Sequence, residues 1–417
     1  MAYRWARHRV YDTGGKDKRG MAAISLLAVA RAAAEETLQG SPMAGAWLKL
    51  FRTQISEDDN YWLRWRSDLA ESAELRRAYS GLYGRFFARS LLTSHLGLSR
   101  FLSLKRNGIE ILGSIRVERN AKGDIPDWIA WDDRNTRFVL CEAKGSLSAT
   151  DFLKPGAPSC VSEGKAQFER VTSYVGGRQI YPAQWVAASR WATDQRKGGP
   201  VTILWDPPTE GDSFPKEDVE HHRAAMGRAW LESIAPGLGW SSADALLSSE
   251  RRREVLLVEV KPGAVAPHLN WPASEDIFDT VQPFSEEIRA RLSPQGPMVQ
   301  LRQSITERDN LTESDLYGDR SLLDQSPHEE GGHEGEYLVS LITRFGIRPI
   351  RTRADFEMLQ NAQERAYRLE EPAMIVGLPI GFDPSQPDNV IWRDEAGIAS
   401  KGGLSIFDLR MTSVNRI

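Results

Sequence analysis

Three residues between positions 123 and 146, in the sequence GDIPDWIAWDDRNTRFVLCEAKGS, have side chains suited to metal-assisted chemistry on phosphodiester bonds. Asp127 and Glu142, helped by a backbone carbonyl, are oxygen donors of the kind that hold Mg²⁺ with several of its waters retained, and Mn²⁺ is the alternative ion. The metal would polarise a phosphate oxygen and lower the pKa of a bound water. Lys144 would position or activate the attacking water and offset charge on the phosphate.

The stretch is expected to form a β-hairpin that brings the three side chains together. Asp127 begins one apolar strand directly after Pro126, while Glu142 and Lys144 end the next. Because side chains alternate between the faces of a strand, Glu142 and Lys144 project to the same face. A turn at 132–136 places the start of the first strand beside the end of the second, so the two carboxylates can be neighbours.

A surface hairpin with an exposed Glu–Lys pair is the alternative interpretation of the same residues. The flanking sequences WIAW and FVLC are strongly apolar. They favour a buried hairpin whose polar end forms a site. Gly145 follows Lys144 directly, and because it has no side chain we interpret it as room for a phosphate backbone to approach.

The order Pro126–Asp127, a spacer, and then Glu142-x-Lys144 at the end of an apolar strand resembles the PD-(D/E)XK nuclease superfamily, the group of restriction-endonuclease-like folds. The resemblance covers roughly residues 67–205, where a helix precedes the motif and a helix and a strand follow it, as in the family's core. It implies a Mg²⁺-dependent endonuclease in which Asp127 and Glu142 bind the metal and Lys144 acts on water. It also implies a bacterial role such as restriction, phage defence or DNA processing.

Two further features of that family have candidates here. Many members place a glutamate on the preceding helix near the metal, and Glu71 or Glu74 could take that part, although acids are favoured in the first turn of any helix. Many also place a glutamine or lysine on the following helix, where Lys165 and Gln167 are candidates. Gln167 and Tyr174 would share one helical face, but their spacing does not match the tighter glutamine–tyrosine spacing of the RecB-like branch.

A second E-x-K sequence, Glu259 to Lys261, also ends an apolar stretch and is the main rival site. The nearest upstream acid that ends a strand is Asp206. The long segment between Asp206 and Glu259 has a helical pattern, which a hairpin would not need. We therefore interpret these two strands as extensions of the sheet with polar residues at its rim.

Histidines and glycine-rich loops offer weaker candidates. His221 and His222 are adjacent, so on a helix they face different directions and cannot both bind one metal ion. His328 and His333 lie in an acidic, glycine-rich segment that is typical of a linker. The phosphate-binding patterns GxxxxGK[ST] and GxGxxG are absent from the sequence.

Two groups of basic residues could contact a polyanion, although charged helix faces are usually only solvated. The first group consists of Arg85, Arg89, Arg100, Lys105 and Arg106, and the second of Arg344, Arg348, Arg351 and Arg353. The 417-residue chain carries a net charge of -4. Contact with nucleic acid must therefore come from a local patch or from metal ions at an acidic site.

The compartment follows from the cysteines and from the apolar segments. Cys141 and Cys160 are the only cysteines, which excludes a disulfide framework and a thiolate zinc site and favours a reducing cytoplasm. The apolar run at 21–34 is too short to span a bilayer. We interpret it as a buried helix, with a signal peptide as the alternative.

The pattern of elements predicts an α/β protein with a central mixed β-sheet flanked by helices, an N-terminal helical region and a C-terminal α/β accessory unit. The expected divisions are an arm and helices at 1–66, a nuclease-like domain at 67–263, a partly acidic linker at 264–336 and the accessory unit at 337–417. Helices are predicted at 21–38, 43–55, 67–95, 162–175, 337–345 and 354–370, and within 209–250 around a loop at 236–239. Strands are predicted at 101–106, 109–119, 126–131, 138–144, 184–191, 201–205, 252–263, 347–350 and 373–380, with residues 1–20 as an arm or edge segment.

The sequence thus predicts a metal-dependent nuclease with nucleic acid, expected to be DNA, as its partner and no membrane association. A second copy of the chain and a defence-system protein are the candidate protein partners. The alternatives are an RNA-directed nuclease and a non-catalytic nucleic-acid-binding or assembly protein with a nuclease fold.

Overall fold

The structure is a computed structural model that describes most of the chain. The described residues are 3–12, 16–40, 63–66, 72–146, 152–193, 199–207, 209–251, 258–262, 335–343, 346–367, 374–393, 397–409 and 412–416. The predicted helix at 43–55, nearly all of the linker at 264–336 and the two histidines His328 and His333 lie outside these residues.

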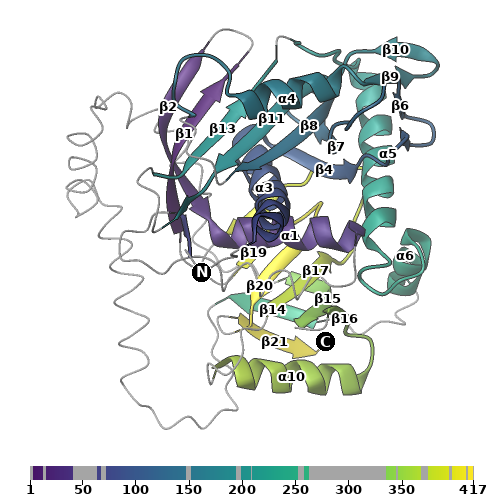
Figure 1. Cartoon of the computed structure of the whole chain (residues 1–417). Helices are drawn as coiled ribbons and strands as arrows, with labels where there is room; N and C mark the ends of the chain where they lie inside the picture. The colour runs from purple at the N-terminus through teal and green to yellow at the C-terminus, as the bar shows by residue number, and fades with distance from the viewer. Residues whose placement is uncertain are drawn as a thin grey trace.

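A seven-stranded mixed sheet carries the hairpin of interest (Figure 1). Its order is β2-β1-β13-β11-β8-β7-β4, in which β8 runs parallel to β11, β1 runs parallel to β13, and the other neighbours are antiparallel. The strands are β1 (Tyr3–Tyr11), β2 (Asp17–Ser25), β4 (Leu98–Ser103), β7 (Trp128–Asp132), β8 (Arg137–Ser146), β11 (Ala183–Arg190) and β13 (Val201–Trp205). The prediction of a central mixed sheet with flanking helices is confirmed at this level.

Two helices cover opposite faces of this sheet. Helix α3 (Ala73–Leu96) packs on the face that carries Val139 and Cys141 of β8. Helix α4 (Ser159–Phe168) packs on the other face, where its Gly164 lies against the Glu142 side chain. Because side chains alternate between the faces of β8, Glu142 and Lys144 point toward α4.

Helix α3 has well-defined ends. The Ser72 hydroxyl accepts a hydrogen bond from Leu75 N at 3.1 Å, as expected of an N-cap. At the other end Gly97 adopts a left-handed conformation (φ 72°) and donates to Thr93 O at 3.0 Å. Most of the residues from Tyr83 to Leu92 are buried, whereas the first turns are exposed. The predicted helix at 67–95 therefore exists, with its first described residue at Ala73.

The N-terminal segment differs from the prediction. The described residues of the segment 1–20, predicted as an arm or edge segment, and the predicted start of the helix at 21–38 form the β1–β2 hairpin at the edge of the sheet, and helix α1 (Leu26–Gly40) begins only after it. The hairpin is no mobile arm, and some of its basic residues are buried with partners. Arg9 is 1 % exposed and bonds to Asp17 and to the carbonyl oxygens of residues 152, 154 and 156.

The segment after the hairpin also differs. The predicted helix at 162–175 is helix α4, which starts after Pro158 rather than at Ser162, followed by strand β9 (Val171–Val175). Strand β9 belongs to a four-stranded sheet of order β10-β9-β6-β5. The others are β5 (Gly108–Glu110), β6 (Ile115–Arg119) and β10 (Arg178–Ile180). The run VTSYV is rich in β-branched and aromatic residues, and its pairing with β6 favours a strand over a helix.

A second large sheet occupies the C-terminal part of the chain, in the order β18-β19-β20-β17-β15-β14-β21, with β16 beside β15. Its strands are β14 (Val258–Pro262), β15 (Gly335–Thr343), β16 (Gly346–Pro349), β17 (Met374–Pro379), β18 (Val390–Arg393), β19 (Gly397–Ser400), β20 (Ser405–Asp408) and β21 (Thr412–Arg416). The predicted helix at 337–345 is wrong, because these residues form β15 between β14 and β17. The predicted helix at 354–370 is α10 (Arg353–Tyr367).

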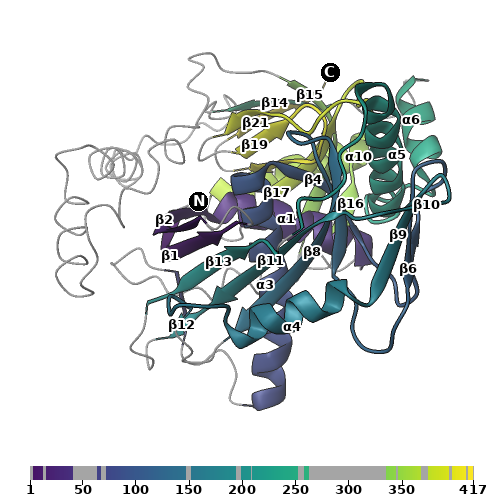
Figure 2. The same cartoon turned by 90° about the horizontal axis from the view of Figure 1, so that it is seen from above.

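Helix α1 connects the two large sheets. It lies between them in Figure 1 and contacts α3, α5 (Lys216–Ile234), β19 and β20. Ala-rich residues of α1 share one hydrophobic core with Ile342, Val376 and Ile406 of the C-terminal sheet. Figure 2 shows the same arrangement from above. The described part of the chain is completed by α6 (Ala243–Arg251) and by a short pair, β3 (Arg64–Trp65) with β12 (Ala192–Thr193).

None of the helices in the described segments is long and apolar enough to cross a membrane.

Candidate active site

The structure brings Asp127, Glu142 and Lys144 together where β7 begins and β8 ends. The antiparallel register pairs Trp128 with Cys141, so Asp127 stands beside Glu142. Asp127 N donates to Glu142 Oε2 at 3.0 Å, and Ala143 N donates to Asp127 Oδ2 at 2.8 Å. Lys144 Nζ lies 2.6 Å from Glu142 Oε1. The predicted hairpin, including the convergence of its two carboxylates, is confirmed.

Both carboxylates are poorly solvated, and the pKa of each is raised. Glu142 is 3 % exposed. Burial, followed by the charge of Asp127, raises the pKa of Glu142 to about 8. Burial also raises the pKa of Asp127, although Arg85 opposes this shift. The side chains of Asp127 and Lys144 remain 20 % exposed, so the site opens to solvent at these two residues.

Gln167 of α4 completes the polar contacts of Glu142. With its amide nitrogen facing the carboxylate, Gln167 donates to Glu142 Oε2 and Oε1 at 2.5 and 2.6 Å, and its oxygen accepts from Lys144 Nζ at 3.1 Å. The side chain therefore fixes both charged members of the E-x-K sequence. Of the two candidates on the following helix, Gln167 joins the site, whereas Lys165 lies over the Trp205 ring, 4.9 Å from its centroid.

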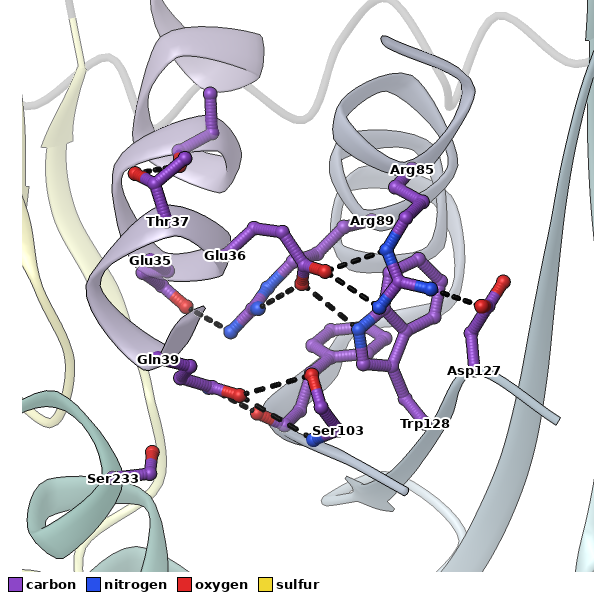
Figure 3. Close-up of polar contacts among 12 residues, drawn as sticks. Glu35, Glu36, Thr37, Gln39, Arg85, Arg89, Ser103, Asp127, Trp128 and Ser233 are labelled. Carbon is purple, nitrogen blue, oxygen red and sulfur yellow. Dashed lines mark hydrogen bonds and ion pairs between the residues drawn. The ribbon is translucent and has the colours of Figure 1, made fainter. Parts of the chain in front are cut away.

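Asp127 is also held from the other side by a group that the sequence did not suggest (Figure 3). Arg85 of α3 donates from Nη1 to Asp127 Oδ1 and from Nε to Glu36 Oε1, the latter at 2.6 Å. The guanidinium lies over the Trp128 ring, 4.4 Å from the centroid. Trp128 Nε1 donates to the second oxygen of Glu36 at 2.9 Å. Glu36 on α1 thus sets the position of Arg85, and Arg85 that of Asp127.

A buried ionic network extends from Glu36 away from the hairpin. Arg89 donates to Glu36 at 3.1 Å and to Glu35 at 2.6 Å. Arg31 contacts both Glu35 and, in the C-terminal part of the chain, Asp388. Burial alone would raise the pKa of Glu36, but the neighbouring Arg85 and Arg89 guanidiniums lower it below its ordinary value. Glu36 is therefore a charged anchor and not a proton donor.

The residues present fit a divalent cation. Asp127 and Glu142 are hard oxygen donors at the ends of neighbouring strands. Burial raises the pKa of both carboxyls, and a bound cation would stabilise their charged forms. Within the described residues, no group of three or more His, Cys, Asp or Glu side chains is arranged to hold a metal. Mg²⁺ commonly uses one or two carboxylates and takes its other ligands from water and substrate phosphates, so two carboxylates are sufficient.

Other predicted participants lie elsewhere. Glu74 is exposed in the first turn of α3, about 16 Å along the helix from Arg85, and Glu71 lies outside the described residues. Tyr174 is in β9 and not on the helix of Gln167. The interpretation of Gly145 as room for a phosphate is wrong, since a side chain there would overlap Ser80 O of α3. Gly145 instead permits close packing of α3 on β8.

The rival E-x-K sequence belongs to a different sheet. Strand β14, which contains Glu259, pairs with β15 and β21, whereas Asp206 follows β13 of the seven-stranded sheet. The interpretation of these two strands as extensions of one sheet is therefore wrong. Glu259 lies opposite Glu336 and Asn415 in the register, and no strand brings Asp206 beside it.

Most residues of the first basic group and the two adjacent histidines have partners within the fold, whereas the Arg348 and Arg353 side chains of the second group are 60 % and 81 % exposed. Arg85 and Arg89 bind carboxylates, and Arg100, only 3 % exposed, donates to the carbonyl oxygens of Arg223 and Gln386. Of the first basic group only Lys105 and Arg106 are exposed. The adjacent histidines serve structure: His222 bonds to Ser114 Oγ at 2.9 Å, and His221 contacts Gly113 O.

Comparison of the chain with protein-family models, with curated proteins and with solved structures returned no match.

Proposed function

We propose that the protein is a metal-dependent nuclease of the PD-(D/E)XK type, with DNA as its expected substrate. The observation that carries this proposal is the convergence of Asp127, Glu142 and Lys144 at one end of a buried hairpin. The order of elements adds support: α3, β4, β7, β8, α4 and β11 occur in the order that the resemblance implies, with β5, β6, β9 and β10 of the four-stranded sheet inserted between them. Gln167 stands on the following helix, where many members carry a glutamine.

The chain's own residues suggest how the site would work. Asp127 and Glu142 would hold the cation, which when bound supplies charge stabilisation on the phosphate and acidifies a water ligand. Lys144 lies at the exposed edge of the site, where its ammonium can orient the attacking water and offset charge on the phosphate. Gln167 hydrogen-bonds to both Lys144 and Glu142 and so holds their side chains in position. Arg85 holds the Asp127 carboxylate in place.

The first experiment is a cleavage assay on linear, circular and single-stranded DNA and on RNA, with Mg²⁺, Mn²⁺ or EDTA. We expect metal-dependent cleavage that Asp127→Asn reduces by about 10²-fold or more, because it removes a metal-binding charge. Asp124→Asn is the matched control, since Asp124 is exposed on the loop that precedes the hairpin. Equal activity of the wild type and Asp127→Asn on every substrate would refute the site.

The same assay separates the remaining alternatives. Cleavage of RNA alone would assign the site to an RNA-directed nuclease. Binding of nucleic acid without any metal-dependent cleavage would indicate a non-catalytic binding or assembly protein. Bacterial restriction or phage defence is the role that the family resemblance implies for a DNA-cleaving site, and protection of cells against phage infection, lost on Asp127→Asn, would test it.

A further inference from the structure

Arg85 has donors that its contacts within the fold leave for another ligand. A guanidinium carries five N–H donors in a rigid fork. Among the contacts of the described residues, Nε and Nη2 face Glu36, and Nη1 faces Asp127. Within the described part of the chain, one N–H on each Nη atom is left. A pair of such donors matches two oxygens of a phosphate.

The neighbouring Arg89 shows what a purely structural arginine looks like in the same helix. Its side chain is 1 % exposed, and it donates to Glu35 and Glu36 in the interior. Arg85, one turn earlier, is 26 % exposed although it shares Glu36 with Arg89. The difference places Arg85 at the opening of the site, beside the partly exposed Asp127.

The guanidinium of Arg85 is already positioned before any ligand arrives. Glu36 fixes its Nε edge, and the Trp128 ring supports its flat face at 4.4 Å. Figure 3 shows the group between Glu36 and Asp127 and over the indole. A side chain held in this way loses little conformational entropy on binding, which favours it as a ligand contact.

The helix surface next to Arg85 leaves room for a bulky ligand. Gly81 is one turn earlier on the same face, since residues four apart are neighbours on a helix. It is exposed, and a Cβ built on it would meet no atom of the described residues within 4 Å. A nucleic-acid backbone could therefore pass over Gly81 to reach Arg85.

We propose that Arg85 is a substrate-binding residue that donates to a non-bridging oxygen of a nucleic-acid phosphate while Glu36 and Trp128 hold its guanidinium. The inference rests on the proposed function, since it assigns the second cation of that site. Lys144 approaches the site from β8 and Arg85 approaches it from α3. The two cations flank the carboxylates and offset the repulsion between them and a polyanion.

The test measures binding and does not depend on cleavage. Fluorescence anisotropy of a labelled DNA duplex, a labelled single strand and a labelled RNA is followed in EDTA over a range of salt concentrations. Each phosphate contact contributes about 0.9 to the slope of log K against log salt concentration for a duplex, and about 0.7 for a single strand. We expect Arg85→Gln to weaken binding and to reduce the slope by about one contact, and Arg85→Lys to keep the slope.

Two controls separate a direct contact from a structural effect. Arg228→Gln removes an exposed arginine of α5, 62 % of whose side chain is accessible, and should leave the slope unchanged. Arg89→Lys weakens the buried contacts to Glu35 and Glu36 and should also leave the slope unchanged. An unchanged slope in Arg85→Gln, an equal fall in Arg89→Lys, or no binding of any probe by the wild type would overturn the proposal. If Arg85→Gln leaves the slope unchanged while Asp127→Asn loses cleavage, the role of Arg85 is rejected and the proposed function stands.

Discussion

Two E-x-K sequences end strands in this chain, and the fold treats them differently. Glu142 lies in the seven-stranded sheet, 3 % exposed, with Asp127 on the neighbouring strand and Gln167 above it. Glu259 lies in the C-terminal sheet, half-buried, with the exposed Glu336 opposite. The same short sequence thus becomes a candidate site in one place and a strand end in the other.

The difference shows which features turn a short motif into a site. Around Glu142, a hairpin supplies a second carboxylate, a covering helix supplies an amide, and burial strengthens every electrostatic interaction. The Glu36–Arg85 pair adds a fixed cation beside Asp127. The partners come from residues 36, 85, 127 and 167, so only the folded chain assembles them.

The largest expected contrast is in catalysis. Lys144→Ala should lower the cleavage rate by about 10²- to 10⁴-fold, since it removes the group that would orient or activate water. Lys261→Ala, the equivalent change in the second E-x-K sequence, should leave the rate within about 2-fold. Single-turnover rates on one substrate, with circular dichroism as a check of folding, measure both. A loss of cleavage in Lys261→Ala alone would move the active site to the second E-x-K sequence.

The next contrast is in stability. Glu36→Ala removes the carboxylate that Arg85 and Arg89 share. Breaking a buried ion pair costs about 3–5 kcal/mol. Glu259→Ala should cost about 1 kcal/mol or less. Urea denaturation at neutral pH gives both values. Similar losses for the two variants would mean that the network around Glu36 contributes no special stability.

The dependence of stability on pH should also separate the two glutamates. The pKa of Glu142 rises from 4.5 to about 8 on folding because of burial and the charge of Asp127. The folded state therefore binds the extra proton, and the free energy of unfolding should fall as pH rises from about 4.5 to 8, by up to about 1.4 kcal/mol per pH unit. Glu142→Gln should flatten this fall, while Glu259→Gln should not. Urea denaturation across this pH range provides the comparison, and identical slopes in all three proteins would contradict the account.

The smallest expected effects concern the packing of α3 on β8. A methyl group at Gly84 would lie 2.7 Å from Gly145 N, so Gly84→Ala should destabilise the protein by about 1–3 kcal/mol. Gly81→Ala meets open space in the same helix and should stabilise it by about 0.5–1 kcal/mol. Thermal denaturation of the two variants measures the difference. Equal changes in melting temperature would mean that α3 and β8 are not closely packed at Gly145.

Local patterns in the sequence were enough to predict the hairpin and its three polar residues. Two apolar runs on either side of a turn predict the hairpin, and its register places Asp127 beside Glu142. The interior of α3 and the loop between α5 and α6 also follow from helical spacing and from glycines. These features depend on neighbours in the sequence.

Features that depend on distant partners could not be predicted in this way. The sequence around Arg9 does not show that this residue is buried, because its partner Asp17 and the carbonyl oxygens around residue 154 are brought to it only by folding. Glu36 follows the apolar run at 21–34, and nothing near it in the sequence points to Arg85 or Arg89. A usable signal is the four-residue spacing of Arg85 and Arg89 within an apolar helix. Buried arginines need acidic partners, but the spacing does not show where in the chain those partners are.

The most direct test of the central claim is calorimetric titration of Mn²⁺ or Mg²⁺ into the wild type, Glu142→Gln and Glu259→Gln, because it does not require the substrate to be known. We expect the wild type and Glu259→Gln to bind the metal equally, and Glu142→Gln to lose at least about tenfold in affinity because it removes one of two charged ligands. Unchanged affinity in Glu142→Gln, with loss of affinity in Glu259→Gln, would contradict that claim.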